Sequence, residues 1–255
     1  MVAKEFSLQG KVAIVAGDGQ AWSQHVALPL ADAGADVVVV GRKGKGIAEI
    51  AEIAERVRGL GRKAIVIPAN VTNAVEVRNM VKQATAGFGK IDILVNGTNL
   101  QFAKPLLEVS KKEWRQVIET NLTSVFICCQ VVGKHMMEQR KGTIINIASG
   151  LALRGVANFA AYCASMGGVL QFSKALALEW APANIRVNSI GPGWFSGEKA
   201  GTDEARKDPL QRFIPMRRCG RPDDIAALVV YLASDASQYV TGQMFAVDGG
   251  AIAHG

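Results

Sequence analysis

Three polar residues stand at positions where side chains could do chemistry. Ser149 ends the apolar segment GTIINIAS, and Tyr162 lies thirteen positions further on, in the first turns of the next expected helix. Asn121 interrupts the apolar stripe of another expected helix, where a buried carboxamide needs hydrogen-bond partners. Tyrosine is one of the side chains that serve as general acids or bases. Each residue alone equally suits a structural role, as a strand end, a helix start or an asparagine satisfied by nearby backbone.

The elements around these residues alternate between short apolar segments and longer amphipathic ones. The first half reads KVAIVAG, a helical pattern from Trp22 to Ala33, ADVVVVG, a helical pattern from Ile47 to Val57, KAIVIPAN, a helical pattern from Ala74 to Ala86, and IDILVNG. This alternation predicts a parallel sheet with helices on both faces. Ligands of such sheets bind outside the carboxyl ends of the strands, which is where Ser149 falls.

The second half continues the pattern with a helix from about Lys111 to Glu138, the strand GTIINIAS, a helix from about Phe159 to Trp180, and the strands NIRVNSI and QMFAV. The 255 residues contain no linker or repeat. They predict one domain, residues 1–255, with a doubly wound Rossmann-type α/β fold of about seven parallel strands. The irregular stretch 191–221 is too long for a simple connection, so we expect it to form a lid over the binding crevice.

Composition limits the partners that the protein is expected to have. The net charge of +7 comes from scattered basic residues without a recognition motif, so nucleic-acid binding is not expected. The apolar runs are far shorter than the roughly 18 residues of a membrane span, and the opening MVAKEFSLQG lacks a signal-peptide stretch. These features predict a soluble, cytoplasmic protein. The four cysteines show no metal-ligand spacing, so reduced, packed thiols and no metal are expected.

Taken together and in this order, the polar residues resemble those of the short-chain dehydrogenase/reductase family, and the resemblance covers essentially the whole chain. In that family an Asn, Ser, Tyr and Lys set does acid/base work beside a nicotinamide. The resemblance implies that Tyr162 exchanges a proton with the substrate oxygen, that Ser149 positions this oxygen, and that Asn121 anchors a water relay. Further matches are Asn96 after the fourth strand, Pro192 and Gly193 in SIGPGWF, and Asp248, Gly249 and Gly250 near the C-terminus.

The fourth catalytic position departs from the family pattern. Where the family has Y-x-x-x-K, this chain reads YCASM, so the neutral thioether of Met166 replaces an ammonium. In the family this lysine lowers the tyrosine pKa and holds the nicotinamide ribose. A free phenol has a pKa near 10. If the lysine lowers the tyrosine pKa by about 2 to 3 units, its absence makes the phenolate less favourable by roughly 3 to 4 kcal/mol at neutral pH. The corresponding rate loss is roughly a hundredfold to a thousandfold.

The expected cofactor loop departs as well. Family members carry T-G-x-x-x-G-x-G after the first strand, because glycines let the backbone approach a pyrophosphate at a helix N-terminus. This chain reads AGDGQAWS, in which Gly17 is kept while Ala21 and Ser23 replace glycines. Trp22 stands where a smaller apolar residue is usual.

Positions that normally frame the adenosine also differ. The family's N-N-A-G has become Asn96, Gly97, Thr98 and Asn99, and its aspartate after the third strand is Asn70. After the second strand Gly41, Arg42 and Lys43 replace the acid that would hold a ribose diol, so any dinucleotide preference leans toward NADP. The expected cofactor-binding set is Gly17, Ala21, Trp22, Arg42, Asn70, Asn96, Pro192 and Gly193.

Three functions follow as hypotheses. The leading one is a catalytically impaired subunit of an NAD(P)-dependent dehydrogenase, like non-catalytic family subunits of acyl-CoA-oxidising complexes. It would join an active paralogue in a heterotetramer, the alternative being a homotetramer. The second is an active NAD(P)(H)-dependent oxidoreductase in which Tyr162, Ser149 and Asn121 suffice, acting on a carbonyl or acyl-CoA substrate. The third is a regulatory module that binds another small molecule. The lysine of the family is missing at Met166, and two glycines of the family are missing from the segment AGDGQAWS. Together these departures favour the impaired-subunit hypothesis and weigh against cofactor binding by this chain alone.

Overall fold

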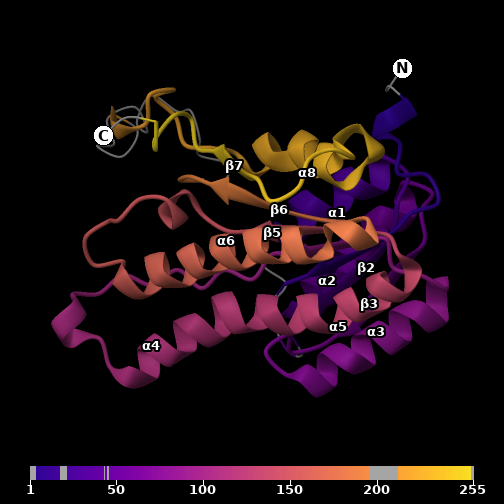
Figure 1. The fold of residues 1–255 in the computed structure, drawn as a ribbon, viewed down its shortest axis with the longest axis horizontal. Coiled ribbons are helices and arrows are strands. Elements are labelled where there is room, and N and C mark those ends of the chain that lie inside the picture. Colours follow the sequence, from indigo (N-terminus) through magenta and orange to yellow (C-terminus); the bar gives the residue numbers. More distant parts are fainter. Residues whose placement is uncertain (1–3, 18–21, 43, 45, 196–211, 254–255) are drawn as a thin grey trace.

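The computed structural model describes residues 4–17, 22–42, 44, 46–195 and 212–253. Seven strands form one sheet in the order β3-β2-β1-β4-β5-β6-β7, and every neighbouring pair is parallel (Figure 1). The chain builds outward from β1 to β3, then restarts at β4 on the other side of β1. This order confirms the predicted doubly wound Rossmann fold. The strands are β1 (Val12–Ala16), β2 (Asp36–Gly41), β3 (Ala64–Pro68), β4 (Ile93–Asn96), β5 (Gly142–Ile147), β6 (Ile185–Pro192) and β7 (Met244–Val247).

Helices cover both faces of the sheet because the strands are apolar on both sides. Along β1, Ile14 and Ala16 belong to one buried cluster, whereas Ala13 and Val15 belong to the other. The first cluster packs under α3, α5 and α6, and the second under α1, α2 and α8. The helices are α1 (Trp22–Asp32), α2 (Gly46–Gly59), α3 (Ala74–Phe88), α4 (Lys111–Ile118), α5 (Ser124–Gln139), α6 (Ala160–Trp180) and α8 (Ala226–Ala233).

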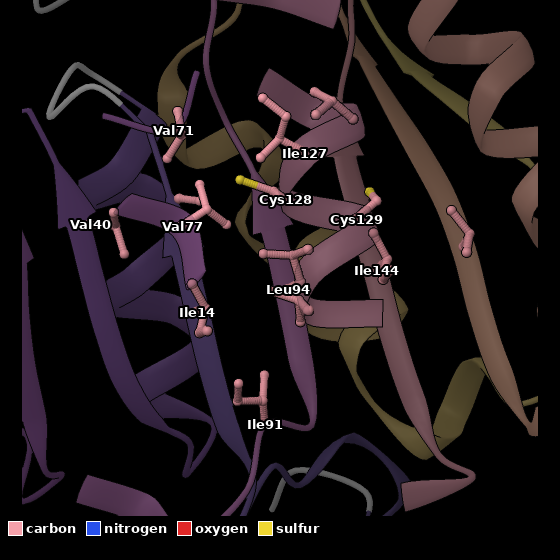
Figure 2. Close-up of a cluster of buried hydrophobic side chains, with 14 of the residues drawn as sticks. Ile14, Val40, Val71, Val77, Ile91, Leu94, Ile127, Cys128, Cys129 and Ile144 are labelled. Carbon is pink, nitrogen blue, oxygen red and sulfur yellow. The ribbon is translucent and has the colours of Figure 1, made fainter. Parts of the chain in front are cut away.

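The first cluster also contains two adjacent cysteines. Figure 2 shows Cys128 and Cys129 on their helix beside Leu94 and Ile144 of the sheet. Both thiols are free and fully buried, and burial raises the pKa of Cys128 to about 12. These two residues are packed thiols, as the sequence predicts.

The predicted helix over 111–138 is present, with a local change of winding at its middle. Ser110 and Glu113 form the capping box that starts α4, and Glu119–Thr123 then form a π-helical turn before α5 begins. A π turn inserts an extra residue into the helical ladder and is frequent at functional sites. Asn121 lies in this turn and is 1% exposed, so the turn places its carboxamide inside the protein.

The predicted lid segment needs a correction at its start. Gly191 and Pro192 are the last two residues of β6 and are buried, because the strand runs further than its apolar pattern indicates. The segment therefore leaves the sheet at Gly193. Residues 196–211 lie outside the described part of the chain.

The indole of Trp180, at the end of α6, packs directly against Gly133 of α5 and leaves no room for a side chain there. A Cβ atom at position 133 would overlap this ring. We expect Gly133→Ala to lower the free energy of unfolding by about 1 to 3 kcal/mol through overpacking, although alanine is the better helix former.

Urea unfolding followed by circular dichroism would measure this effect, with Gly167→Ala of α6 as the matched control. At position 167 a Cβ atom would meet only the Ala152 carbonyl oxygen, at 3.8 Å, so the control is expected to be neutral or stabilising. Equal destabilisation by both substitutions would contradict the packing argument.

None of the helices in the described residues is long and apolar enough to span a membrane.

Candidate active site

A cavity of about 850 Å³ opens at the carboxyl ends of the strands, where the strand order reverses between β1 and β4. Ligands of doubly wound sheets bind in such a crevice, and the volume lies in the range of small-molecule and cofactor sites. Of the residues predicted to be functional, those that line it are Trp22, Arg42, Ser149, Tyr162, Pro192 and Gly193.

Ser149 and Tyr162 meet at this cavity from consecutive elements. Ser149 follows the buried strand β5, where its Oγ accepts a hydrogen bond of 3.2 Å from the Leu151 amide. Tyr162 lies in the first turn of α6 and is 3% exposed. Burial raises the pKa of Tyr162, and hydrogen bonds from Ser149 and Asn99 oppose this increase only in part. The phenol is therefore protonated at neutral pH and can act as a proton donor.

Asn121 lies behind the cavity rather than in its wall. Its Oδ1 accepts from the Leu100 amide at 2.7 Å, and its Nδ2 donates to the Leu100 carbonyl at 3.1 Å and to Ser165 Oγ at 3.0 Å. These bonds tie the segment after β4 to α6, which carries Tyr162. Asn121 thus positions the active-site wall, and its predicted part in a water relay stays a prediction.

Met166 lies one turn beyond Tyr162 on α6 and is completely buried. Its side chain belongs to the same apolar cluster as Tyr162 and Val125. It contributes packing and no charge. Among the described residues that line the cavity, the basic ones are His25 and Arg42, and neither comes from α6.

The end of the cavity nearest β2 carries the basic residues. Arg42 follows β2, is exposed, and makes no ion pair with a described residue. His25 Nδ1 lies 3.0 Å from an Asp223 carboxylate oxygen, so this imidazole already has a partner. Arg42 is consequently the cation that can hold an anionic group here.

Trp22, the first residue of α1, forms the wall beside this end. Its ring contacts that of Phe195 edge-on, with the centroids 5.0 Å apart. The two rings come from distant parts of the chain, one after β1 and one after β6. Gly17 follows β1 and is buried, and Ala21 lies outside the described residues.

Pro192 and Gly193 form the wall after β6. A Cβ atom on Gly193 would fall 2.6 Å from Cβ of Asp248, so only glycine fits this close approach. Asp248 in turn accepts hydrogen bonds from the Gly250 and Ile252 amides, which folds the C-terminal segment back toward the cavity. Ile252 lies in the cavity wall as a result.

Three described residues of the predicted cofactor set, Gly17, Asn70 and Asn96, are absent from the cavity wall. Asn96 is 2% exposed and donates to Asn146 Oδ1 at 2.8 Å inside the core. Asn70 Oδ1 accepts from Thr72 at the turn into α3. Both carboxamides are engaged in holding the chain, so their direct role toward a cofactor stays a prediction.

Several cavity residues went unpredicted as site residues. Asn99, Trp194 and Phe195 stand in or beside quoted family segments, whereas the others belong to no motif. The signal available was position, since Asn99, Gln101 and Thr120 follow or face the carboxyl end of β4. The described residues contain no cluster of three or more His, Cys, Asp or Glu suited to a metal ion. The unpredicted lining residues include His25, Asn99, Gln101, Gln116, Thr120, Phe159, Trp194, Phe195 and Ile252.

The sheet order and the switch-point crevice define a Rossmann-type α/β protein whose crevice is lined by the hydroxyl groups of Ser149 and Tyr162. A family described as "Enoyl-(Acyl carrier protein) reductase" matches residues 18–251. The chain is 40% identical to 2-dehydro-3-deoxy-D-gluconate 5-dehydrogenase of Escherichia coli (strain K12), covering 99% of this chain and 100% of the relative. It is 37% identical to 3-oxoacyl-[acyl-carrier-protein] reductase of Synechocystis sp., covering 96% and 98%.

A solved structure of a dehydrogenase is also similar to this chain over nearly its whole length. It is a gluconate 5-dehydrogenase from Burkholderia cenocepacia J2315 in complex with NADP and tartrate, with a TM-score of 0.89, 32% identity and 98% of each chain covered. The chain therefore belongs to the short-chain dehydrogenase/reductase family, a family of oxidoreductases.

Proposed function

We propose that this chain is an active NAD(P)(H)-dependent oxidoreductase that interconverts a carbonyl group and a secondary alcohol. The observation that carries the proposal is the Ser149–Tyr162 pair facing a cavity of cofactor size. The similar proteins are named as dehydrogenases and reductases, which favours an active enzyme over the impaired subunit that the sequence suggested.

The cavity fits a nicotinamide dinucleotide. It runs from the carboxyl end of β2 to Tyr162, and Gly193 keeps its wall free of a side chain. Arg42 would hold a 2′-phosphate, since no acid follows β2 to bind a ribose diol. Trp22, Pro192 and Gly193 would contact the remainder of the cofactor. When bound in its reduced form, the cofactor supplies a hydride to the carbonyl carbon.

The protein's own contribution is proton transfer and orientation. The Tyr162 phenol donates its proton to the carbonyl oxygen as the alcohol forms, and water later replaces that proton. Ser149 Oγ can donate a hydrogen bond to the same oxygen and hold it beside the phenol. Because the pKa of Tyr162 is raised, the proton-donating form prevails at neutral pH, which favours rapid reduction over rapid oxidation.

The raised pKa of Tyr162 makes the two directions respond differently to pH. Reduction uses the protonated phenol, so its initial rate is expected to be nearly constant from about pH 6 to 9. Oxidation uses the phenolate, whose fraction rises with pH up to the phenol pKa, so its rate is expected to rise about tenfold per pH unit over the same range.

Initial rates with NADP(H) and NAD(H) would test this account. The substrates would be 2-dehydro-3-deoxy-D-gluconate, a 3-oxoacyl thioester and the corresponding alcohols. An oxidation rate that levels off near pH 7 would mean that another group lowers the pKa of Tyr162. Absence of turnover in both directions with every substrate would refute the proposed activity.

A non-catalytic partner subunit is the second candidate function, and the burial of Met166 in the apolar cluster favours it. Side chains on α5 and α6 could contact an active paralogue, since Phe126 is 43% exposed and Leu178 is 80% exposed. Native mass spectrometry of the complex purified from source cells would then detect a second family member. Homo-oligomers alone would count against this candidate.

A further inference from the structure

Besides Arg42, His25 and Asp248, the cavity that Tyr162 lines carries uncharged hydrogen-bonding groups. Three carboxamides and three hydroxyls line it, namely those of Asn99, Gln101, Gln116, Thr120, Ser149 and Tyr162. Such groups both donate and accept, as the hydroxyl groups of a ligand do. Apolar side chains, among them Leu100 and Phe159, form part of the remaining wall.

Asn99 differs from the other carboxamides that line the cavity because its side-chain oxygen lacks a hydrogen-bond partner. Its Oδ1 is buried and accepts no hydrogen bond from a described residue, while the amide is close enough to Tyr162 to influence the phenol. Two other buried side-chain atoms in the described residues lack partners, on His135 and Ser189, but neither residue lines the cavity. Buried polar atoms are nearly always paired in native proteins, so an unpaired one on a cavity-lining residue points to a partner supplied by a ligand, which the amide would meet by turning its oxygen toward the cavity.

The position of Asn99 decides where that partner lies. The chain leaves β4 at Asn96, and the bonds between Asn121 and Leu100 fix the next residue after Asn99. The Asn99 amide is thereby held within interaction distance of the Tyr162 phenol, at the wall of the same cavity. We infer that Asn99 orients the substrate by pairing with a hydroxyl next to the reacting carbon, so that the cavity takes polyhydroxylated carbonyl compounds such as sugar-acid derivatives.

This inference rests on the proposed function and names its substrate class. The alternative class, a 3-oxoacyl thioester, has methylene groups on either side of the reacting carbonyl and offers no hydroxyl to Asn99. It would leave Oδ1 unpaired in a closed site. A site built to pair with a substrate hydroxyl discriminates strongly against analogues that lack it, because its buried polar groups are then unsatisfied.

Binding of carboxylic acids matched in carbon number provides the test, because it does not depend on turnover. The probes are D-gluconate and D-galactonate against hexanoate, and L-tartrate against succinate, titrated into the full chain and followed by NMR. At least one polyhydroxy acid is expected to bind about tenfold or more tightly than its unsubstituted counterpart. Asn99→Ala is expected to remove most of this preference, whereas Gln130→Ala, which changes an exposed amide of α5 outside the cavity, should preserve it.

Each outcome decides the inference. Equal binding of hydroxylated and unsubstituted acids, no binding of any acid, or an undiminished preference in Asn99→Ala would each overturn it. Circular dichroism establishes that the variants are folded. Cofactor titration and turnover test the proposed function separately, so a chain that binds sugar acids through Asn99 but does not bind NAD(P)(H) would refute the oxidoreductase while leaving the polyhydroxy-acid site.

Discussion

Replacing Met166 with lysine is expected to raise the rate of alcohol oxidation at pH 7 by about 100-fold to 1,000-fold. Residue 166 lies one turn from Tyr162 on α6, and both side chains belong to the same buried cluster. An ammonium there would favour the phenolate and lower the pKa of Tyr162 by about 2 to 3 units. Each unit gives about ten times more phenolate, until the pKa falls to the working pH.

Steady-state rates of Met166→Lys and wild type across pH would measure the gain. The oxidation profile of the variant is expected to level off at lower pH than that of wild type. Met166→Leu is the matched control, since it keeps the apolar volume and should leave the profile unchanged. The variant is also expected to unfold at lower urea concentration, because position 166 is fully buried. A folded lysine variant with an unaltered profile would contradict the proposed influence of residue 166 on the phenol.

Replacing Tyr162 with phenylalanine is expected to slow catalysis in both directions by about 10²-fold to 10⁴-fold. Proton transfer by a positioned side chain contributes about 10²-fold to 10⁴-fold, and Tyr162 is the phenol that lines the described cavity. Phenylalanine keeps the ring that packs edge-on against Phe159, at a centroid distance of 6.2 Å. The variant should therefore fold and bind cofactor as wild type does.

Turnover and cofactor affinity measured together distinguish a chemical from a structural effect of this substitution. Tyr239→Phe serves as the control, because Tyr239 is fully exposed and should tolerate the change with full activity. Retention of most of the activity in Tyr162→Phe would identify another proton donor and reject the assigned role of the phenol.

The sequence predicted the architecture well because strands buried on both faces give continuous apolar runs, and helices between them give a clear period. The place of Ser149 and Tyr162 at the cavity was predictable for the same reason, since Ser149 follows a strand and Tyr162 lies at the start of a helix. The π turn at Asn121 has no comparable signal, because α-helical and π-helical windings share one apolar pattern over a single turn.

The hydrogen-bond partners of the carboxamides were also beyond sequence reasoning. Asn70, Asn96 and Asn99 all lie at or shortly after strand ends. Asn96 is paired within the core and Asn70 with a turn, whereas Asn99 lines the cavity and keeps an unpaired buried oxygen. Residue type was the same in the three cases. Only the tertiary neighbours of each amide separate a packing role from a place in the site.

The measurement that tests the central claim most directly is calorimetric titration of the full chain alone with NADPH and NADH. The account predicts dissociation constants in the micromolar range or below, with NADPH bound about tenfold more tightly through Arg42. In Arg42→Ala the difference between the two cofactors should disappear. A flat titration with both cofactors would contradict the assignment of oxidoreductase activity to this chain.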